Sequence, residues 1–147
     1  MPNFTYSLNV VGRCTKMQRG EALKETGVCG GQVPYFLRIC RMPGLSQEEM
    51  ARGMYVNKST AARVIANLEK AGFVERRPSE EDRRRLLLYP TEKALQALPK
   101  VREIVRGWND YLLEEFTEEE KEALVSMMNR ISKRAQAFIQ REGAWDE

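Results

Sequence analysis

Apolar side chains recur at helical spacing in the first twenty-odd residues, and again in a short segment beyond a glycine-rich break. The first run predicts a helix within about 3–25, and its spacing rests on Phe4, Leu8, Val11 and Ala22. After the break at 27–31, a second, short helix is marked by Val33, Phe36, Leu37 and Cys40. Pro34 fits this helix only in its first turn, where a missing N–H costs nothing.

Capping residues predict the next two helices. The run Ser46-Gln47-Glu48-Glu49 is a capping box that opens a third helix with Met50 and Met54 as its apolar positions. Asn57 is a suitable N-cap for a fourth helix that reaches Ala71, before Gly72. The inward face of this fourth helix is expected to comprise Ala61, Val64 or Ile65, and Leu68.

The pattern then changes from helical to extended. Residues 73–77 and 85–89 are predicted to form two short strands, joined by a polar turn at 78–82. Helical spacing resumes after Thr91, and Pro99 is expected to kink this helix or divide it in two. A second capping box at 117–120 opens a last helix with an apolar stripe: Leu124, Met127 or Met128, Ile131, Ala135 and Phe138. The predicted fold is mainly α with one β-hairpin, in a single domain over 1–147.

Composition excludes several classes of function. The 147 residues contain no histidine, which rules out His-based triads and His–metal sites. No Gly-rich phosphate loop, nucleophile elbow or metal-ligand spacing is present, so an enzyme is not expected and neither is a cofactor. The longest uncharged stretch is too short and too glycine-rich to span a membrane, and no secretory signal is visible. Three cysteines, an odd number, favour a reducing, cytoplasmic location over a disulfide framework.

The charge is unevenly distributed, although the net charge of +3 is mild. Residues 52–89 hold nine basic and five acidic side chains, whereas residues 99–147 hold eight basic and eleven acidic ones. A basic middle beside an acidic end is typical of a protein with a surface for a polyanion. Charge alone leaves the alternative open that both are solvated helix faces.

Two short helices joined by a tight turn and followed by a hairpin define the winged helix-turn-helix plan. An α-helix fits the DNA major groove, and its first residues reach the base edges. The outward face of the fourth helix offers Lys58, Ser59, Thr60, Arg63 and Asn67 for this purpose. Beside the hairpin tip, basic side chains suited to a narrow minor groove are Arg83, Arg84 and Arg85. The competing interpretation is an ordinary polar face of an amphipathic helix.

Several segments, in this order and spacing, resemble the MarR family of bacterial transcription regulators. They are 45–51, 58–65, 68–76, the wing signature 82–84 with 86–88 and 91–93, and the last-helix start at 116–120. The resemblance implies a cytoplasmic homodimer that binds a pseudo-palindromic operator; the leading hypothesis is a DNA-binding regulator that acts as a repressor, with the direction of regulation left open. It also implies a DNA-binding part at about 31–91 and dimerisation helices at about 3–25 and 94–140.

The resemblance assigns roles within the wing and the dimer. Arg84 matches the position whose arginine enters the minor groove, and Asp82 matches the position that braces the wing, although Asp82 is also a common turn residue. The stripe Leu124, Met128, Ile131 and Phe138 would pack across a two-fold axis. Burial of that stripe inside one chain is the alternative.

Members of this family commonly bind small aromatic or phenolic anions and then release DNA. Candidate ligand contacts here are Arg13, Tyr35, Trp108 and Tyr111, although residues of these types in such positions are more often packing or surface residues than ligand contacts. Cys29 is a candidate redox sensor because a helix N-terminus favours a thiolate, whereas Cys40 is expected to be a small core residue. The alternative functions are a winged-helix module that binds protein or RNA, and a thiol-based regulator.

Overall fold

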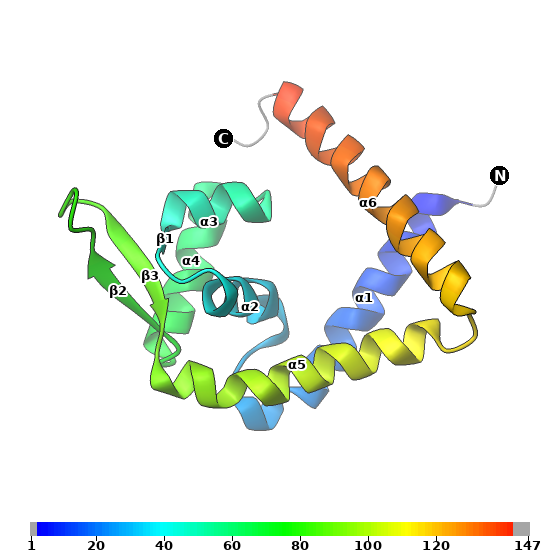
Figure 1. Ribbon diagram of the computed structural model, residues 1–147, viewed down its shortest axis with the longest axis horizontal. Helices are drawn as coiled ribbons and strands as arrows, with labels where there is room; N and C mark the ends of the chain where they lie inside the picture. Colours follow the sequence, from blue (N-terminus) through cyan, green and yellow to red (C-terminus); the bar gives the residue numbers. More distant parts are fainter. Residues whose placement is uncertain (1–2, 143–147) are drawn as a thin grey trace.

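Helix-capping residues set the start of most elements in the computed structural model, which describes residues 3–142. Figure 1 shows a wing and a compact group of short helices at one end, and α1 and α6 at the other, with α5 running between them. The elements are α1 (Phe4–Ala22), η1 (Lys24–Thr26), η2 (Gly30–Gln32), α2 (Val33–Arg41), β1 (Leu45–Ser46), α3 (Gln47–Met54), α4 (Lys58–Lys70), β2 (Val74–Pro78), β3 (Leu86–Pro90), α5 (Glu92–Leu113) and α6 (Glu118–Arg141). The predicted mainly helical fold with a hairpin wing is confirmed, and Pro34 lies in the first turn of α2.

The wing is a three-stranded antiparallel sheet rather than a hairpin alone. Its strand order is β1-β3-β2, and the β2–β3 pairing ends at Pro78 opposite Leu86. β1 is only two residues long and pairs Leu45 with Leu88 and Ser46 with Leu87. No periodicity can predict so short a strand, which explains why it was not expected. Its consequence is that the residues immediately before α3 are hydrogen-bonded to the wing.

The core lies where α2, α4, the first half of α5 and the sheet meet. Phe36 of α2 and Phe73, just before β2, pack edge to face with ring centroids 5.6 Å apart. The predicted inward face of α4 is confirmed, since Ala61, Ile65 and Leu68 are fully buried. Leu23, Val28, Val33, Ile39, Met50, Leu88 and Val101 complete the largest part of this core.

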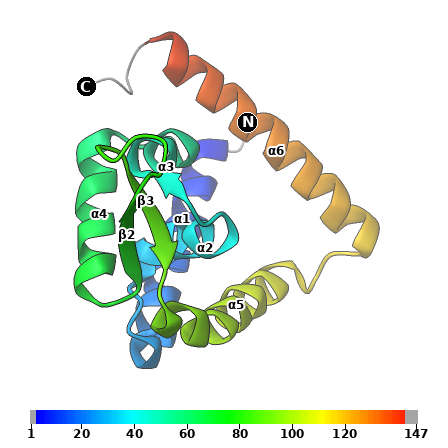
Figure 2. The ribbon, with the colours of Figure 1, turned by 60° about the vertical axis from the view of Figure 1, so that its left-hand side comes forward.

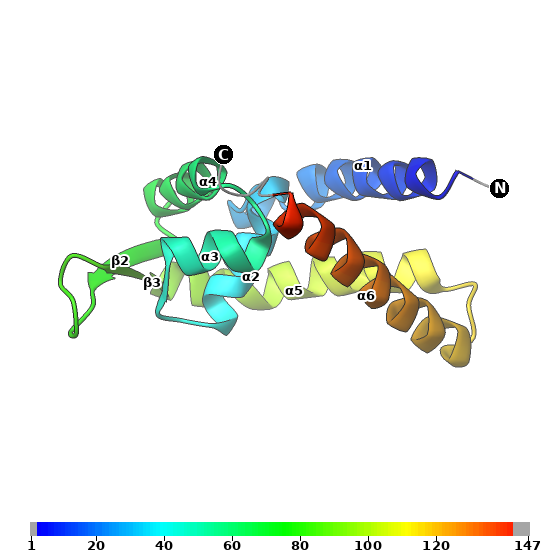
Figure 3. The ribbon, with the colours of Figure 1, turned by 90° about the horizontal axis from the view of Figure 1, so that it is seen from above.

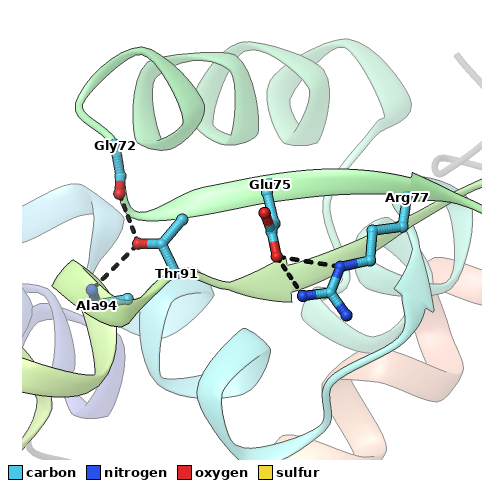
Figure 4. Close-up of polar contacts among 5 residues, drawn as sticks. All are labelled: Gly72, Glu75, Arg77, Thr91 and Ala94. Atoms are coloured by element: carbon cyan, nitrogen blue, oxygen red, sulfur yellow. Dashed lines mark hydrogen bonds and ion pairs between the residues drawn. The ribbon is translucent and has the colours of Figure 1, made fainter.

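Thr91, the N-cap of α5, fastens the base of the wing to the end of α4. Its hydroxyl accepts a hydrogen bond from the backbone N–H of Ala94 (3.2 Å) and donates one to the carbonyl of Gly72 (2.6 Å), as Figure 4 shows. Gly72 has a φ of +84°, a conformation that costs glycine little but strains other residues. The turn between α4 and β2 is therefore held against the start of α5.

Pro99 does not divide α5, so of the two expected outcomes division is wrong, while a kink stays a prediction. The helix continues as one element from Glu92 to Leu113 with the proline inside it. Proline leaves the carbonyl of the residue four positions earlier, Leu95, without its helical partner. Both Pro99 and Leu95 are exposed, so water can satisfy this carbonyl without breaking the helix.

Helices α1 and α6 bury no residue within the described part of the single chain. Figure 2 shows α6 standing away from the other helices, connected to them through the end of α5. Ile131 and Phe138 of α6 are exposed, and so are Leu8 and Val11 of α1. No residue of the α6 stripe is fully buried inside the described chain, where Leu124 and Met128 are partly covered and Ile131 and Phe138 are exposed. None of the helices within residues 3–142 is long and apolar enough to cross a membrane.

Candidate nucleic-acid interface

The turn between α3 and α4 leaves the first residues of α4, Lys58 and Ser59, exposed to solvent. Ser46 and Glu49 form the predicted capping box at the start of α3: the Ser46 hydroxyl accepts from the Glu49 N–H, and the Glu49 carboxylate accepts from the Ser46 N–H (2.8 Å). Tyr55 ends α3 in a left-handed conformation with φ of 56°. Asn57 then caps α4 by accepting from the Thr60 N–H at 2.8 Å, as predicted. Local capping thus fixes the direction of α4.

The outward face of α4 carries the residues that the sequence analysis selected. Lys58, Ser59, Arg63 and Asn67 are exposed, and Thr60 is partly exposed. The Ser59 hydroxyl donates to the Asn57 side chain at 3.0 Å, and Lys58 lies 3.8 Å from the Glu48 carboxylate. Because the opposite face is buried, these side chains form a continuous polar surface on one side of the helix. Whether they contact DNA stays a prediction.

All three arginines of the wing tip are exposed, and two of them lack a polar partner within residues 3–142. The Asp82 carboxylate accepts a hydrogen bond from the backbone N–H of Arg84 at 3.0 Å, and the Asp82 carbonyl accepts from the N–H of Arg85 at 2.9 Å. Asp82 therefore shapes the turn through the backbone rather than through a guanidinium group. Arg83 and Arg84 are exposed, and within residues 3–142 their side chains make no hydrogen bond or ion pair.

The other arginines of the wing are bound to neighbouring side chains. Arg85 forms an ion pair with Glu49 and donates to the Ser46 hydroxyl at 3.4 Å. Arg77 donates to Glu75, as Figure 4 shows, and its guanidinium lies 4.3 Å from the centre of the Tyr89 ring.

Arg76 connects the wing to both helices of the helix-turn-helix. Its guanidinium donates to Gln47 at the start of α3 and to Glu69 near the end of α4, at 3.0 Å each. Sequence reasoning missed the partners Gln47, Glu49 and Glu69, because nothing local relates them to the arginines. The capping box marked Glu49 only as a helix-start residue.

Hydrogen bonding and burial shift three side-chain pKa values near this surface. The Ser46 N–H, and then the Arg85 guanidinium, hold the pKa of Glu49 below its ordinary value, so the carboxylate is ionised at neutral pH. Burial raises the pKa of Tyr35 on α2, against an opposing effect of the nearby Arg63. Burial also raises the pKa of the Cys40 thiol, partly offset by Arg102, which agrees with its expected place among core residues.

The four candidate ligand contacts lie in different surroundings in the single chain. Tyr35 is buried in α2, and Arg13 is exposed on α1. The Trp108 indole donates to the Thr15 hydroxyl at 2.9 Å and stacks on Tyr111, with ring centroids 5.7 Å apart. Trp108 therefore joins α5 to α1, while Tyr111 stacks on it within α5, and a common ligand site for all four stays a prediction. A shallow cleft between the end of α1 and α5 is lined by Ala22, Glu25, Thr26, Lys93, Gln96, Ala97 and Lys100.

The cysteines form no disulfide among the described residues. Cys29 caps the short η2 helix and is exposed, as is Cys14 on α1. A redox role for Cys29 stays a prediction. No group of three or more His, Cys, Asp or Glu side chains within residues 3–142 is arranged to hold a metal ion.

The two capped helices, the exposed face of α4 and the flanking sheet define a winged helix-turn-helix protein. The chain belongs to the MarR family, whose family model matches residues 33–86. It is 31% identical to the uncharacterized HTH-type transcriptional regulator YybA of Bacillus subtilis (strain 168), over 90% of this chain and 89% of YybA. It is also 31% identical to the HTH-type transcriptional regulator BilQ of Clostridium symbiosum, over 80% of this chain and 81% of BilQ.

A solved structure shows the same arrangement. A MarR-family regulator of Listeria monocytogenes, crystallised with a 26-mer DNA, superposes with a TM-score of 0.91 and 26% identity, covering 100% of this chain and 98% of the other. The fold and the family are thus established together. This family is one of transcriptional regulators and not of enzymes.

Proposed function

We propose that this chain is a sequence-specific transcriptional regulator that binds double-stranded DNA as a homodimer on a pseudo-palindromic operator. The observation that carries the proposal is an exposed polar face on α4 beside a wing tip whose Arg83 and Arg84 have no partner within residues 3–142. Such a surface can contact a major groove and the adjacent minor groove at once. The DNA-bound state of the similar Listeria regulator supports it.

In this proposal α4 is the recognition helix. Arg63 and Asn67 have the donors that pair in bidentate fashion with guanine and adenine, respectively. Lys58, Ser59 and Thr60 lie at the helix N-terminus, where they would contact phosphates or bases. At the wing, Arg84 would enter the minor groove beside Arg83, while Asp82 holds the turn from which both project.

The dimer is proposed from the uncovered terminal helices. The stripe Leu124, Met128, Ile131 and Phe138 lies on α6 without a buried residue, and exposed apolar stripes of this kind mark interfaces. In Figure 3 the wing lies at one end of the chain, and α1 and α6 lie at the other. A two-fold axis through the α1–α6 end would therefore leave both wings and both α4 helices free for DNA.

Repression is the direction of regulation that the proposed geometry favours. A dimer with recognition helices in successive major grooves covers more than one helical turn, so RNA polymerase could not occupy the same DNA. Because the proposed target is the DNA of a bacterial cell, the proposal places the activity of the protein in the cytoplasm. Release by a small aromatic or phenolic ligand is part of the proposal and rests on the resemblance to the family.

The test measures, by fluorescence anisotropy, how tightly the Arg84→Ala and Arg63→Ala variants bind an operator that was selected with the unmodified protein. Arg84→Ala should weaken binding and lower the dependence of log K on log salt by about 0.9, because one positive charge that displaces a counterion from the DNA is removed. Arg63→Ala should cost about 1–3 kcal/mol and relax the preference at one base pair per half-site. Arg106→Ala, on the exposed surface of α5, is the matched control, since it removes the same charge away from the wing.

If both variants bound the operator as tightly as the unmodified protein and unfolded at the same temperature, the assignment of α4 and the wing as the DNA interface would be wrong. Equal binding of duplex RNA, or absence of any duplex binding by the unmodified protein, would favour an interaction module over a DNA regulator.

A further inference from the structure

Among residues 3–142, Arg85 supplies the side-chain ion pair and hydrogen bond that link the tip of the wing, residues 79–85, to the start of α3. Strand pairing stops at Pro78 and Leu86. Within the tip, the backbone makes hydrogen bonds from Ser79 to Arg85 and from Arg85 to Asp82. The Ser79–Arg85 bond extends the β2–β3 ladder by one position and the other closes the turn, and neither bond connects the tip to α3. Arg85 is the residue at which the tip rejoins β3, and its guanidinium reaches the N-terminus of α3.

The acceptor of Arg85 is itself fixed in place. One carboxylate oxygen of Glu49 accepts from the Ser46 N–H at 2.8 Å, and the other takes the Arg85 guanidinium. Ser46 is buried, and its hydroxyl accepts from both Glu49 and Arg85. Two of the three groups thus belong to the capping box that starts α3. The ion pair connects positions 36 residues apart and leaves Arg85 charge-compensated, unlike Arg83 and Arg84.

We propose that Arg85 is a positioning residue rather than a DNA contact: held by Glu49 and Ser46, it fixes the wing tip relative to α3 so that Arg84 and the recognition helix meet one duplex together. This inference rests on the proposed function. Glu49 shares the role, since it joins the start of α3 to the wing. Arg76, which bonds to Gln47 and Glu69, fixes the wing nearer its base.

A DNA contact and a positioning role for Arg85 predict opposite effects of the Glu49→Gln substitution on DNA affinity. If Arg85 contacted a phosphate, Glu49 would compete with DNA, and Glu49→Gln would tighten binding. If the pair orients the wing, Glu49→Gln loosens the wing and weakens binding, although it removes a negative charge near DNA. Glutamine also occupies this position in capping boxes, so α3 keeps its N-terminal cap. Glu48→Gln, one residue earlier and without a contact to Arg85, is the matched charge control.

The experiment measures duplex affinity over a range of salt for Arg84→Gln, Arg85→Gln, Glu49→Gln and the double variant Glu49→Gln/Arg85→Gln. Arg85→Gln and Glu49→Gln should each weaken binding about tenfold at every salt concentration, a usual coupling for residues in one hydrogen-bonded network. The double variant should be no weaker than either single one, and the salt slope should stay unchanged. Arg84→Gln should lower the slope by about 0.9, and Glu48→Gln should not weaken binding.

A slope lowered by about 0.9 in Arg85→Gln, or tighter binding by Glu49→Gln, would overturn the proposal. Amide hydrogen exchange of the free protein gives a second readout that needs no DNA. The Ser79 amide should exchange faster in Arg85→Gln and Glu49→Gln than in Arg84→Gln, and equal exchange in all three would also overturn the proposal. Failure of the unmodified protein to bind any duplex would reject the proposed function, while the exchange result would still decide whether the ion pair holds the tip.

Discussion

Phe138→Ala tests whether the apolar side of α6 is a dimer interface. Phe138 is 60% exposed in the single chain, and a phenylalanine presents about 200 Å² of surface, so about 120 Å² is available for burial. At about 25 cal/mol per Å², its burial contributes about 3 kcal/mol in each subunit, or about 6 kcal/mol in the dimer. Alanine retains part of this contact, so the expected loss is about 4 kcal/mol, a thousandfold in the dimer dissociation constant.

Sedimentation equilibrium over a wide concentration range measures that constant directly. Leu95→Ala is the control, because Leu95 is similarly exposed (47%) but lies on α5 near the wing. Phe138→Ala should dissociate at concentrations at which the unmodified protein and Leu95→Ala remain dimeric. Equal dimer affinities for all three proteins would refute the placement of this face at the two-fold axis.

Three further outcomes follow from packing and titration. Phe73→Ala, which removes a fully buried ring, should destabilise the fold by about 3–5 kcal/mol in denaturant unfolding at fixed protein concentration; a loss under 1 kcal/mol would contradict the core described. Single-cysteine variants should show Cys40 reacting much more slowly with a thiol reagent than Cys14 or Cys29, since burial raises its pKa; equal rates would count against this. Because the folded chain lowers the pKa of Glu49, its contribution to stability is complete above the ordinary glutamate pKa of about 4.3 and is lost as pH falls through the lowered value. The stability difference between the unmodified protein and Glu49→Gln should therefore shrink as the pH falls below about 4.3, and a difference that does not change with pH would contradict the assignment.

Local signals in the sequence were sufficient for most of the fold. The caps at Ser46, Asn57, Thr91 and Thr117 act through hydrogen bonds to backbone N–H groups three residues away, so the sequence carries them in short patterns. The inward face of α4 follows from helical spacing for the same reason. Pro99 shows the limit of such rules, because solvent exposure lets α5 accommodate a residue that would break a buried helix.

The candidate site was predicted less completely, because its contacts join distant positions. Three consecutive arginines, Arg83 to Arg85, are equivalent in the sequence, and only the fold separates two uncompensated side chains from one paired with Glu49. β1 escaped prediction because two residues carry no pattern. The sequence also could not show what packs against the apolar stripe of α6, since such a stripe is compatible with burial within one chain or between two. No residue of the stripe is fully buried inside the described chain.

The most direct test of the proposed DNA-reading function is selection of binders from random DNA duplexes at near-physiological salt. We expect enrichment of an inverted repeat with half-site centres about one helical turn apart, the spacing that two recognition helices related by a two-fold axis require. Absence of an enriched sequence, with only weak and salt-sensitive binding, would contradict a dimeric, sequence-specific DNA-binding regulator.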